Sequence, residues 1–159
     1  MSTLILLRHG KSDWSGGEPD QLRPLARRGR HQVPEAGRWL AQNVGVIDLA
    51  VVSPAVRARE TWQLAAAQLT TPPPIREDDR VYAGSARALL GALRELPGDA
   101  GTVVLVGHNP GIEDLVSLLT GGRAPMPTSA LAVITVSGSW WTAGHHSAVL
   151  RASGRPPAT

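Results

Sequence analysis

The sequence contains no cysteine, and this absence excludes several kinds of chemistry. Disulfide bonds, the usual zinc fingers, iron–sulfur clusters and catalysis by a thiol all depend on cysteine. The sequence also has no apolar run of about 18 residues, the length at which a membrane-spanning helix becomes a candidate. The N-terminus has no basic segment before its short apolar stretch, so we expect no signal peptide. These absences favour a cytoplasmic protein with no membrane partner.

Lysine is almost absent, because Lys11 is the one member of the 16 basic residues that is not an arginine. The formal net charge is only +3, and acidic residues are interspersed with basic ones along the chain. Proteins that bind nucleic acid need a basic patch or stripe, so we expect no nucleic-acid partner. Arginine does supply planar guanidinium groups that suit phosphate oxygens.

The length of 159 residues, with 42% hydrophobic and 18% charged residues, predicts one globular domain. We assign residues 1–152 to this domain. Residues 153–159 include two consecutive prolines near the end of the chain and are expected to form a flexible C-terminal tail.

Short apolar runs alternate with helical patterns. The runs are nearly continuous in Val, Ile and Leu, as in strands that helices cover on both faces. We therefore expect an α/β fold of three layers, α/β/α, whose central sheet is mostly parallel with an antiparallel edge. The expected strands are Thr3–Leu7, Leu49–Ser53, Thr102–Val106, Ala130–Val136 and a weaker edge strand at Ser147–Arg151, and the expected helices are 26–43, 55–69, 85–96 and 110–120.

Three features mark the expected helix boundaries. Pro34 should kink or restart the first helix, because proline removes a backbone donor. Ser53 before Pro54 is typical of a helix N-cap and first turn. Asn109 before Pro110 predicts the same arrangement for the last helix.

Polar clusters directly follow three of the predicted strands. Arg8-His9-Gly10 follows the first, Ser53-Pro54-Ala55-Val56-Arg57 the second and Gly107-His108-Asn109-Pro110 the third. The carboxyl ends of parallel strands share one edge of a sheet, and ligands bind there. Two arginines, two histidines and two helix N-termini would converge at that edge, which predicts an anion site that suits phosphate.

These segments resemble the histidine phosphatase superfamily, which has the phosphoglycerate mutase-like fold. The resemblance covers roughly residues 3–137. Arg8-His9-Gly10-Lys11-Ser12-Asp13-Trp14-Ser15 and Asp20-x-x-Arg23-Pro24-Leu25-x-x-Arg28-Gly29 are similar to the SixA-like phosphohistidine phosphatases in particular.

The resemblance implies a role for each matching residue. His9 would be the nucleophile that becomes phosphorylated, Arg8 and Arg57 would hold phosphoryl oxygens, and His108 would donate to an equatorial oxygen. No metal or other cofactor is implied. Further substrate contacts are expected from Gly10, Ser15 and Asn109, although Ser15 stands where many members have a phosphate-contacting asparagine.

The glutamate that acts as general acid in the mutases has no clear counterpart between Thr61 and Tyr82. Asp13 and Glu113 remain candidate acids, with a loop carboxylate and a helix-dipole partner as their structural alternatives. An alkoxide leaving group needs a proton donor, whereas the imidazole of phosphohistidine can carry its own proton. A site without a strong acid is therefore better matched to phosphohistidine.

The expected substrate is a phosphorylated protein that carries phosphohistidine, as in signal transduction. Two alternatives stay open: a phosphatase of small phosphorylated metabolites, and a phosphate-binding module without catalysis. The presence of both His9 and His108 argues against the binding module, because a protein that only binds phosphate could use arginine or lysine at these positions. A basic docking rim for an acidic partner is a further hypothesis, on Arg23, Arg27, Arg28 and Arg30.

The remaining aromatic and histidine residues give weaker signals. Trp14 would wall the site. Trp140 and Trp141 fit either a packed turn or an exposed interaction patch. His145 and His146 are neighbours in a predicted hairpin and would point to opposite faces, a poor geometry for metal binding.

Overall fold

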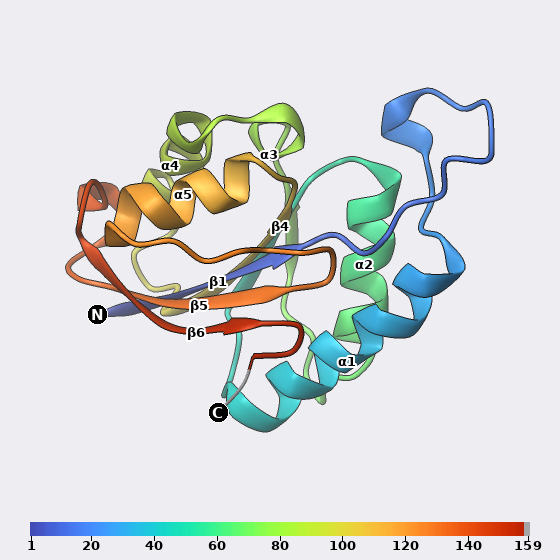
Figure 1. Cartoon of the computed structure of the whole chain (residues 1–159). Coiled ribbons are helices and arrows are strands. Elements are labelled where there is room, and N and C mark those ends of the chain that lie inside the picture. The colour runs from blue at the N-terminus through green and yellow to red at the C-terminus, as the bar shows by residue number, and fades with distance from the viewer. Residues whose placement is uncertain (158–159) are drawn as a thin grey trace.

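The computed structural model describes residues 1–157 and contains one six-stranded sheet with the order β3-β2-β4-β1-β5-β6 (Figure 1). The first four strands of this order are mutually parallel, and β5 and β6 are antiparallel additions at one side. The strands are β1 (Ser2–Arg8), β2 (Leu49–Val52), β3 (Ile75–Glu77), β4 (Thr102–Gly107), β5 (Leu131–Val136) and β6 (Ala148–Gly154).

Helices cover both faces of this sheet, in α1 (Arg27–Asn43), α2 (Val56–Ala66), α3 (Arg80–Ala83), α4 (Ala86–Arg94) and α5 (Gly111–Thr120). Successive residues of β1 enter different cores, because side chains alternate along a strand. Leu4 and Leu6 pack in the core that contains residues of α4 and α5. Ile5 and Leu7 pack in the core that contains residues of α1 and α2. The predicted three-layer fold and its antiparallel edge are thus confirmed.

Among the strands and α-helices, two elements were not predicted from the sequence, the edge strand β3 and the short helix α3. All three residues of β3 are exposed, and within residues 1–157 the strand pairs only with β2. A three-residue edge strand lacks the buried apolar run that revealed the other parallel strands. The predicted helix 55–69 is α2, which ends earlier, at Ala66.

Helix α1 continues through Pro34 over 17 residues, so of the two expected effects of this proline, a kink or a restart, the restart was wrong. Proline deprives the carbonyl four residues earlier of its donor, and here that residue is the exposed Arg30. A carbonyl on the water side of a helix can be hydrated, which allows the helix to continue.

The C-terminal segment joins the sheet. Ser153 and Gly154, which the sequence analysis assigned to the tail, belong to β6, and Gly154 forms a bridge with Pro157. The rest of the expected tail, residues 158–159, lies outside the described residues. Within the described part of the chain, no helix is both long and apolar enough to cross a membrane.

The two neighbouring tryptophans have different environments. Trp140 is buried, and its indole N–H donates to the carbonyl of Ala100 at 2.7 Å. The side chain of Trp141 is exposed. The packed-turn hypothesis therefore fits Trp140, whereas the surface hypothesis is confined to Trp141.

Candidate active site

The two predicted catalytic histidines lie side by side at the carboxyl ends of adjacent central strands. The register of β1 and β4 pairs Arg8 with Gly107, and the next residue on each strand is a histidine. The ring centroids of His9 and His108 are 5.0 Å apart, with the planes inclined by 53°. Topology thus brings together residues that are far apart in the sequence.

His9 is fixed in one tautomer by a backbone hydrogen bond. Its ring is almost fully buried, and Nδ1 lies 2.7 Å from the carbonyl oxygen of Gly10. Because a carbonyl only accepts, Nδ1 carries the proton and Nε2 keeps its lone pair. Burial, reinforced by the charges of Arg57 and Arg8, lowers the pKa of His9 to about 4. Its Nε2 therefore carries an unprotonated lone pair at physiological pH.

His108 is oriented by Ser53. Its Nε2 lies 2.7 Å from the Ser53 hydroxyl, which is fully buried. Burial, followed by the neighbouring His9, lowers the pKa of His108 to about 3. The expected N-cap role of Ser53 was wrong: α2 begins at Val56, Ala55 is the N-cap residue, and no side chain caps the helix.

Asn109 and Pro110 also differ from the expected helix start. Pro110 is the N-cap residue of α5, and the helix begins at Gly111. The Asn109 side chain still accepts a hydrogen bond from the backbone N–H of Glu113, at 3.3 Å. The shift is one residue, and the expected contact between the asparagine and the first turn is retained.

Arg8 and Arg57 complete the cluster around His9. Nη1 of Arg8 donates to the carbonyl of Met126 at 3.0 Å. Both Nη atoms of Arg57 donate to Asp20, one to its backbone oxygen at 2.7 Å and one to its carboxylate at 3.0 Å. The inner part of each guanidinium group, around Nε, is buried.

Three buried nitrogens of this cluster have no hydrogen-bond partner within residues 1–157: Arg8 Nε, Arg57 Nε and His108 Nδ1. We call them the three open nitrogens. All three residues line the same cleft as His9, which has a volume of about 300 Å³. Leaving a buried polar group unpaired is costly, and phosphoryl oxygens would satisfy the two arginine Nε–H donors and, in its Nδ1–H tautomer, His108. The arrangement can therefore bind and stabilise a tetrahedral oxyanion beside a nucleophilic imidazole.

The other predicted substrate contacts are placed differently. The Gly10 N–H donates to Thr61 at 2.9 Å, and Ser15 is exposed, where its hydroxyl donates to Asp13 at 2.7 Å. Asn109 lines the cleft, but its amide donates to Glu113 at 2.7 Å and to the carbonyl of Met126 at 3.0 Å. Of these three residues, only Asn109 is among those that line the cleft.

The two candidate acids are both engaged as hydrogen-bond acceptors. Asp13 is exposed, and the side-chain and backbone donors of Ser15 lower its pKa, so it stays ionised near neutral pH. Glu113 accepts from Asn109 and from the backbone N–H of Met126 at 2.8 Å. Glu113 thereby holds the segment whose carbonyl binds Arg8, which is a positioning role.

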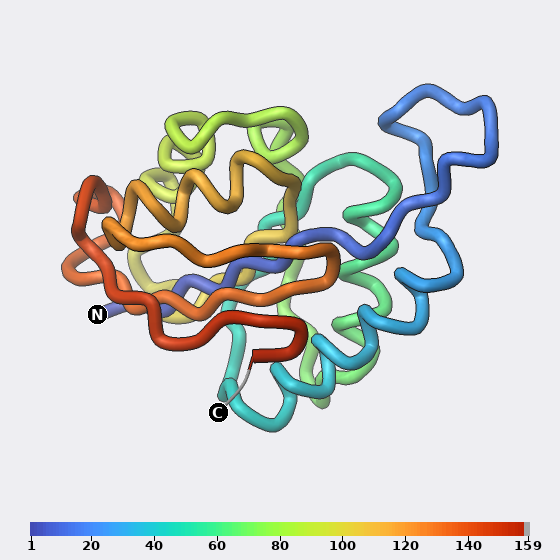
Figure 2. The backbone as a smooth tube through the Cα atoms, viewed as in Figure 1, coloured from blue at the N-terminus to red at the C-terminus, as the bar shows by residue number. Residues whose placement is uncertain are grey.

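Asp20, Arg23 and Tyr82 are parts of the cluster to which the sequence analysis gave no catalytic role. Asp20 lies in the 3₁₀ helix η1 (Asp20–Leu22), on the excursion of the chain between β1 and α1 (Figure 2). Its carboxylate accepts from both other side chains. The segment from Asp20 to Leu25 resembles the SixA-like proteins, and the close spacing of Asp20 and Arg23 is the sequence signal that could have indicated their contact.

Arg23 does not belong to an exposed docking rim, because it is only 6% exposed. Its guanidinium carbon lies 3.4 Å from the ring centroid of Trp14, which is 69% exposed and lines the cleft. Arg27, Arg28 and Arg30 are exposed at the start of α1, and Arg30 pairs with Glu60 at 3.7 Å.

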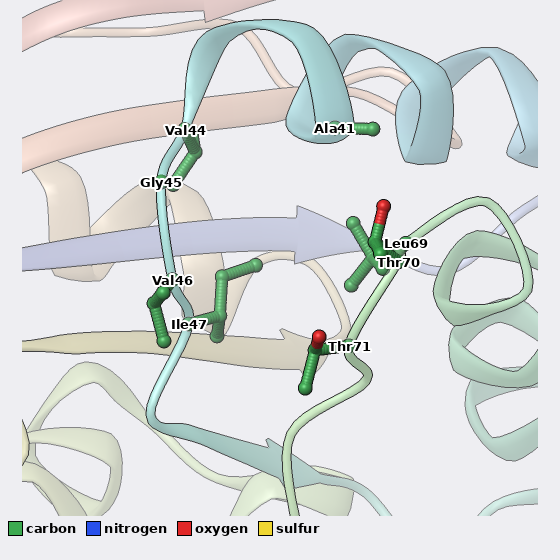
Figure 3. Close-up of a pocket in the computed structure, with 8 residues that line it drawn as sticks. All are labelled: Ala41, Val44, Gly45, Val46, Ile47, Leu69, Thr70 and Thr71. Carbon is green, nitrogen blue, oxygen red and sulfur yellow. The ribbon is translucent and has the colours of Figure 1, made fainter.

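A second cavity, of about 280 Å³, lies between the end of α1 and the segment that follows α2 (Figure 3). Its lining is apolar apart from two threonines: Ala41, Val44, Gly45, Val46, Ile47, Leu69, Thr70 and Thr71. No group of three or more His, Cys, Asp or Glu residues within residues 1–157 is arranged to hold a metal ion. The cleft at His9 is therefore the candidate active site on chemical grounds.

Known proteins match this chain over most of its length. The model of the histidine phosphatase superfamily (branch 1) matches residues 4–82. The uncharacterized protein ML1117 of Mycobacterium leprae is 31% identical over 148 residues, which cover 84% of this chain and 89% of that protein.

Two solved structures are similar over most of the chain. A protein of Nakamurella multipartitia assigned as the phosphohistidine phosphatase SixA has a TM-score of 0.83 and 27% identity, covering 96% of this chain and 95% of that one. Its counterpart from Agrobacterium tumefaciens has a TM-score of 0.78 and 28% identity, covering 85% and 92%. The chain has the phosphoglycerate mutase-like fold, and its likeness to these proteins supports a phosphatase activity. It belongs to the histidine phosphatase superfamily.

Proposed function

We propose that the protein is a metal-independent phosphatase that removes phosphate from phosphohistidine in a protein, through a covalent intermediate on His9. The observation that carries this proposal is the position of the His9 ring. Nδ1 of His9 is bound to the Gly10 carbonyl, so the free lone pair of the ring is on Nε2. The ring lines the same cleft as the residues of the three open nitrogens.

In the first step, Nε2 of His9 attacks phosphorus in line with the leaving group. A P–N bond to His9 forms while the bond between phosphorus and the leaving group breaks. The three open nitrogens donate to the equatorial oxygens, with the Ser53 hydroxyl donating to Nε2 of His108 so that its Nδ1 carries the proton. Loss of one such oriented donor typically costs about 2.7–4 kcal/mol of barrier.

In the second step, a water molecule attacks phosphorus and the P–N bond breaks, which releases inorganic phosphate. The phosphorylated ring keeps its Nδ1 proton through the bond to the Gly10 carbonyl. The ring is then cationic while phosphorylated, so the departing imidazole leaves as a neutral group. Neutral His9 is regenerated for the next cycle.

The choice of phosphohistidine rests on the leaving group. Asp13 is an ionised, exposed carboxylate, and Glu113 is occupied with Met126 and Asn109. A leaving imidazole can depart with a proton that it already carries, whereas an alkoxide needs an acid worth roughly 10²–10⁴-fold in rate. The exposed Trp14 at the cleft fits access by a residue on a protein surface.

The decisive experiment ranks kcat/KM for a panel of phosphohistidine proteins against phosphorylated metabolites. We expect the phosphohistidine proteins to be preferred, and comparable turnover of an unactivated alkyl phosphate would contradict this specificity. Hydrolysis of p-nitrophenyl phosphate should persist in EDTA and disappear in His9→Ala. Activity that EDTA abolishes, or that survives His9→Ala, would contradict the mechanism.

A further inference from the structure

The carboxylate of Asp20 is the meeting point of side chains from three segments. One carboxylate oxygen accepts from Arg23, through Nε at 3.2 Å and Nη2 at 2.9 Å. The other accepts from Arg57 at 3.0 Å and from the hydroxyl of Tyr82 at 2.6 Å. The Tyr82 ring also meets the His108 ring edge-on, with centroids 5.7 Å apart. Asp20 therefore contacts one member of the catalytic cluster directly and a neighbour of another.

The contacts with Asp20 fix the orientation of the Arg57 guanidinium group beside the cleft. Both Nη atoms of Arg57 donate to Asp20, through its backbone oxygen and its carboxylate. A guanidinium group is planar and rigid, so fixing both Nη atoms also fixes the direction of the Nε–H bond. Nε is one of the three open nitrogens. Asp20 thus controls the orientation of a donor that it does not itself touch.

Asp20 also places a negative charge among the arginines that must bind an anion. The hydrogen bond from Tyr82, followed by those from Arg23 and Arg57, holds the pKa of the Asp20 carboxyl well below its usual range. A permanently ionised carboxylate here offsets part of the positive charge of Arg57 and Arg23, which weakens attraction for a free phosphate dianion. The same carboxylate keeps the Arg57 guanidinium group in one orientation.

We propose that Asp20 is a positioning residue that aims Arg57 at the in-line transition state and at the same time limits the affinity for ground-state phosphate. The inference rests on the proposed function, because it assumes phosphoryl transfer to His9. It assigns a role to the acid of the Asp20-x-x-Arg23 segment and connects that segment with Arg57 and Tyr82.

The test compares the binding of two probes, inorganic phosphate and orthovanadate, to the full chain and to Asp20→Asn by calorimetry. Vanadate adopts the five-coordinate geometry of in-line transfer, and such analogues report on transition-state complementarity. We expect vanadate affinity to fall by at least about tenfold, while phosphate affinity stays within about threefold or rises because the carboxylate charge is gone. Parallel loss of both affinities, as a merely structural role predicts, or no change in either, would overturn the proposal.

Two further variants complete the test. Glu77→Gln is the matched control, because Glu77 pairs with Arg59 of the same helix α2, at 2.6 Å and outside the cleft. It should change neither affinity. Tyr82→Phe removes one donor to Asp20 and keeps the aromatic ring. We expect vanadate affinity to fall more than phosphate affinity, by a smaller factor than in Asp20→Asn. If Asp20→Asn does not fold, this variant tests the proposal, and equal changes in both affinities would overturn it.

The outcomes also separate this inference from the proposed function. Calorimetry needs no turnover, so the roles of Asp20 and of the whole site are measured independently. A wild-type protein that hydrolyses neither phosphohistidine nor p-nitrophenyl phosphate would contradict the proposed function. A fully active wild-type protein whose Asp20→Asn variant loses no more vanadate affinity than phosphate affinity would contradict only the role of Asp20.

Discussion

At the scale of single residues, the reactivity of the site depends on which nitrogens carry protons. Burial and nearby arginines keep His9 neutral, and the Gly10 carbonyl selects its Nδ1–H tautomer. The Ser53 hydroxyl forms the hydrogen bond that orients the His108 ring, through Nε2. Two predictions test these assignments.

The first prediction concerns the titration of His9. We expect its ring to stay neutral down to about pH 4, well below the ordinary histidine range, because the pKa is lowered to about 4. The measurement is an NMR titration of ¹⁵N-labelled histidines, with His9→Gln to assign the signal, and the neutral form should show the pattern of an Nδ1–H ring. A midpoint in the ordinary range near 6.5 would contradict the environment described for His9.

The same shift has a consequence for stability. The unfolded chain takes up the His9 proton below about pH 6.5, whereas the folded protein does so only near 4. Between these values the unfolded state binds more protons, so the free energy of unfolding decreases as the pH falls. The slope from one such group approaches about 1.4 kcal/mol per pH unit, and His9→Gln should reduce the slope.

The second prediction is that Ser53→Ala lowers kcat by removing the only side-chain hydrogen bond that His108 makes within residues 1–157. Leaving a buried polar group unsatisfied costs roughly 1–3 kcal/mol, which corresponds to about 5- to 150-fold in rate where the bond is needed in the transition state. Single-turnover kinetics measure the effect. Ser147→Ala serves as control, because within residues 1–157 the Ser147 hydroxyl bonds only to the backbone of Gly144, and an equal loss in both variants would argue against an orienting role.

The sequence could identify His9, Arg8, Arg57 and His108 because each directly follows a strand or lies in the next helical turn. It could not predict the contacts of Asp20 with Arg57 and Tyr82, since these depend on how the irregular excursion between β1 and α1 (Figure 2) packs against α2. Their roles in the reaction remain predictions.

At the scale of elements, the packing of α1 against the loop after β1 supports the site from behind. A Cβ atom on Gly29, in the first turns of α1, would lie 2.5 Å from the backbone oxygen of Lys11. Gly10 is similarly enclosed, with Val33 of α1 at 2.8 Å from the place of its Cβ. The helix therefore fits tightly against the loop that carries the carbonyl partner of His9.

The third prediction follows from this close contact. Gly29→Ala should lower the free energy of unfolding by about 1–3 kcal/mol through overpacking and should also reduce kcat, because the loop that holds His9 must move. Gly91→Ala is the matched control inside helix α4, where the nearest atom to the added Cβ is 3.7 Å away. Alanine there should raise stability by about 0.5–1 kcal/mol. Chemical denaturation measures both, and equal behaviour of the two variants would contradict the packing argument.

The regular elements were largely predictable because their hydrophobic patterns are local. The strands β1, β2, β4 and β5 are apolar runs that lie between two layers of helices, which the pattern indicated directly. β3 escaped prediction because an exposed edge strand carries no such pattern. At Pro34 a local pattern was present but did not decide the structure. The buried face of α1, which includes Val33 and Leu40, stabilises the helix across the proline.

At the scale of the whole molecule, the cleft opens beside an aromatic side chain that is exposed yet held in place. Trp14 stacks on Arg23, and Arg23 is itself fixed by Asp20 and by Ser12 at 2.8 Å. Exposed aromatic residues with fixed geometry are typical anchors at protein interfaces. Trp141 is equally exposed, at 72%, and is not among the residues that line the cleft.

The fourth prediction uses this pair of tryptophans. If the substrate is a protein, Trp14→Ala should lower kcat/KM for a phosphohistidine protein by about tenfold, equivalent to roughly 1.4 kcal/mol, and affect p-nitrophenyl phosphate much less. Trp141→Ala should change neither. A loss of the same size for both substrates in Trp14→Ala would assign Trp14 to the general architecture of the cleft and contradict a role in recognising a protein.

In the proposed mechanism, the bond from the His9 ring to the Gly10 carbonyl would also determine which isomer of phosphohistidine forms. With Nδ1 closed off by Gly10, phosphorus can be attached only at the far nitrogen of the imidazole. An acid-free quench during turnover should therefore yield the tele isomer, 3-phosphohistidine, at position 9 and none of the pros isomer. Antibodies that distinguish the two regioisomers would identify the phosphorylated nitrogen directly on a blot.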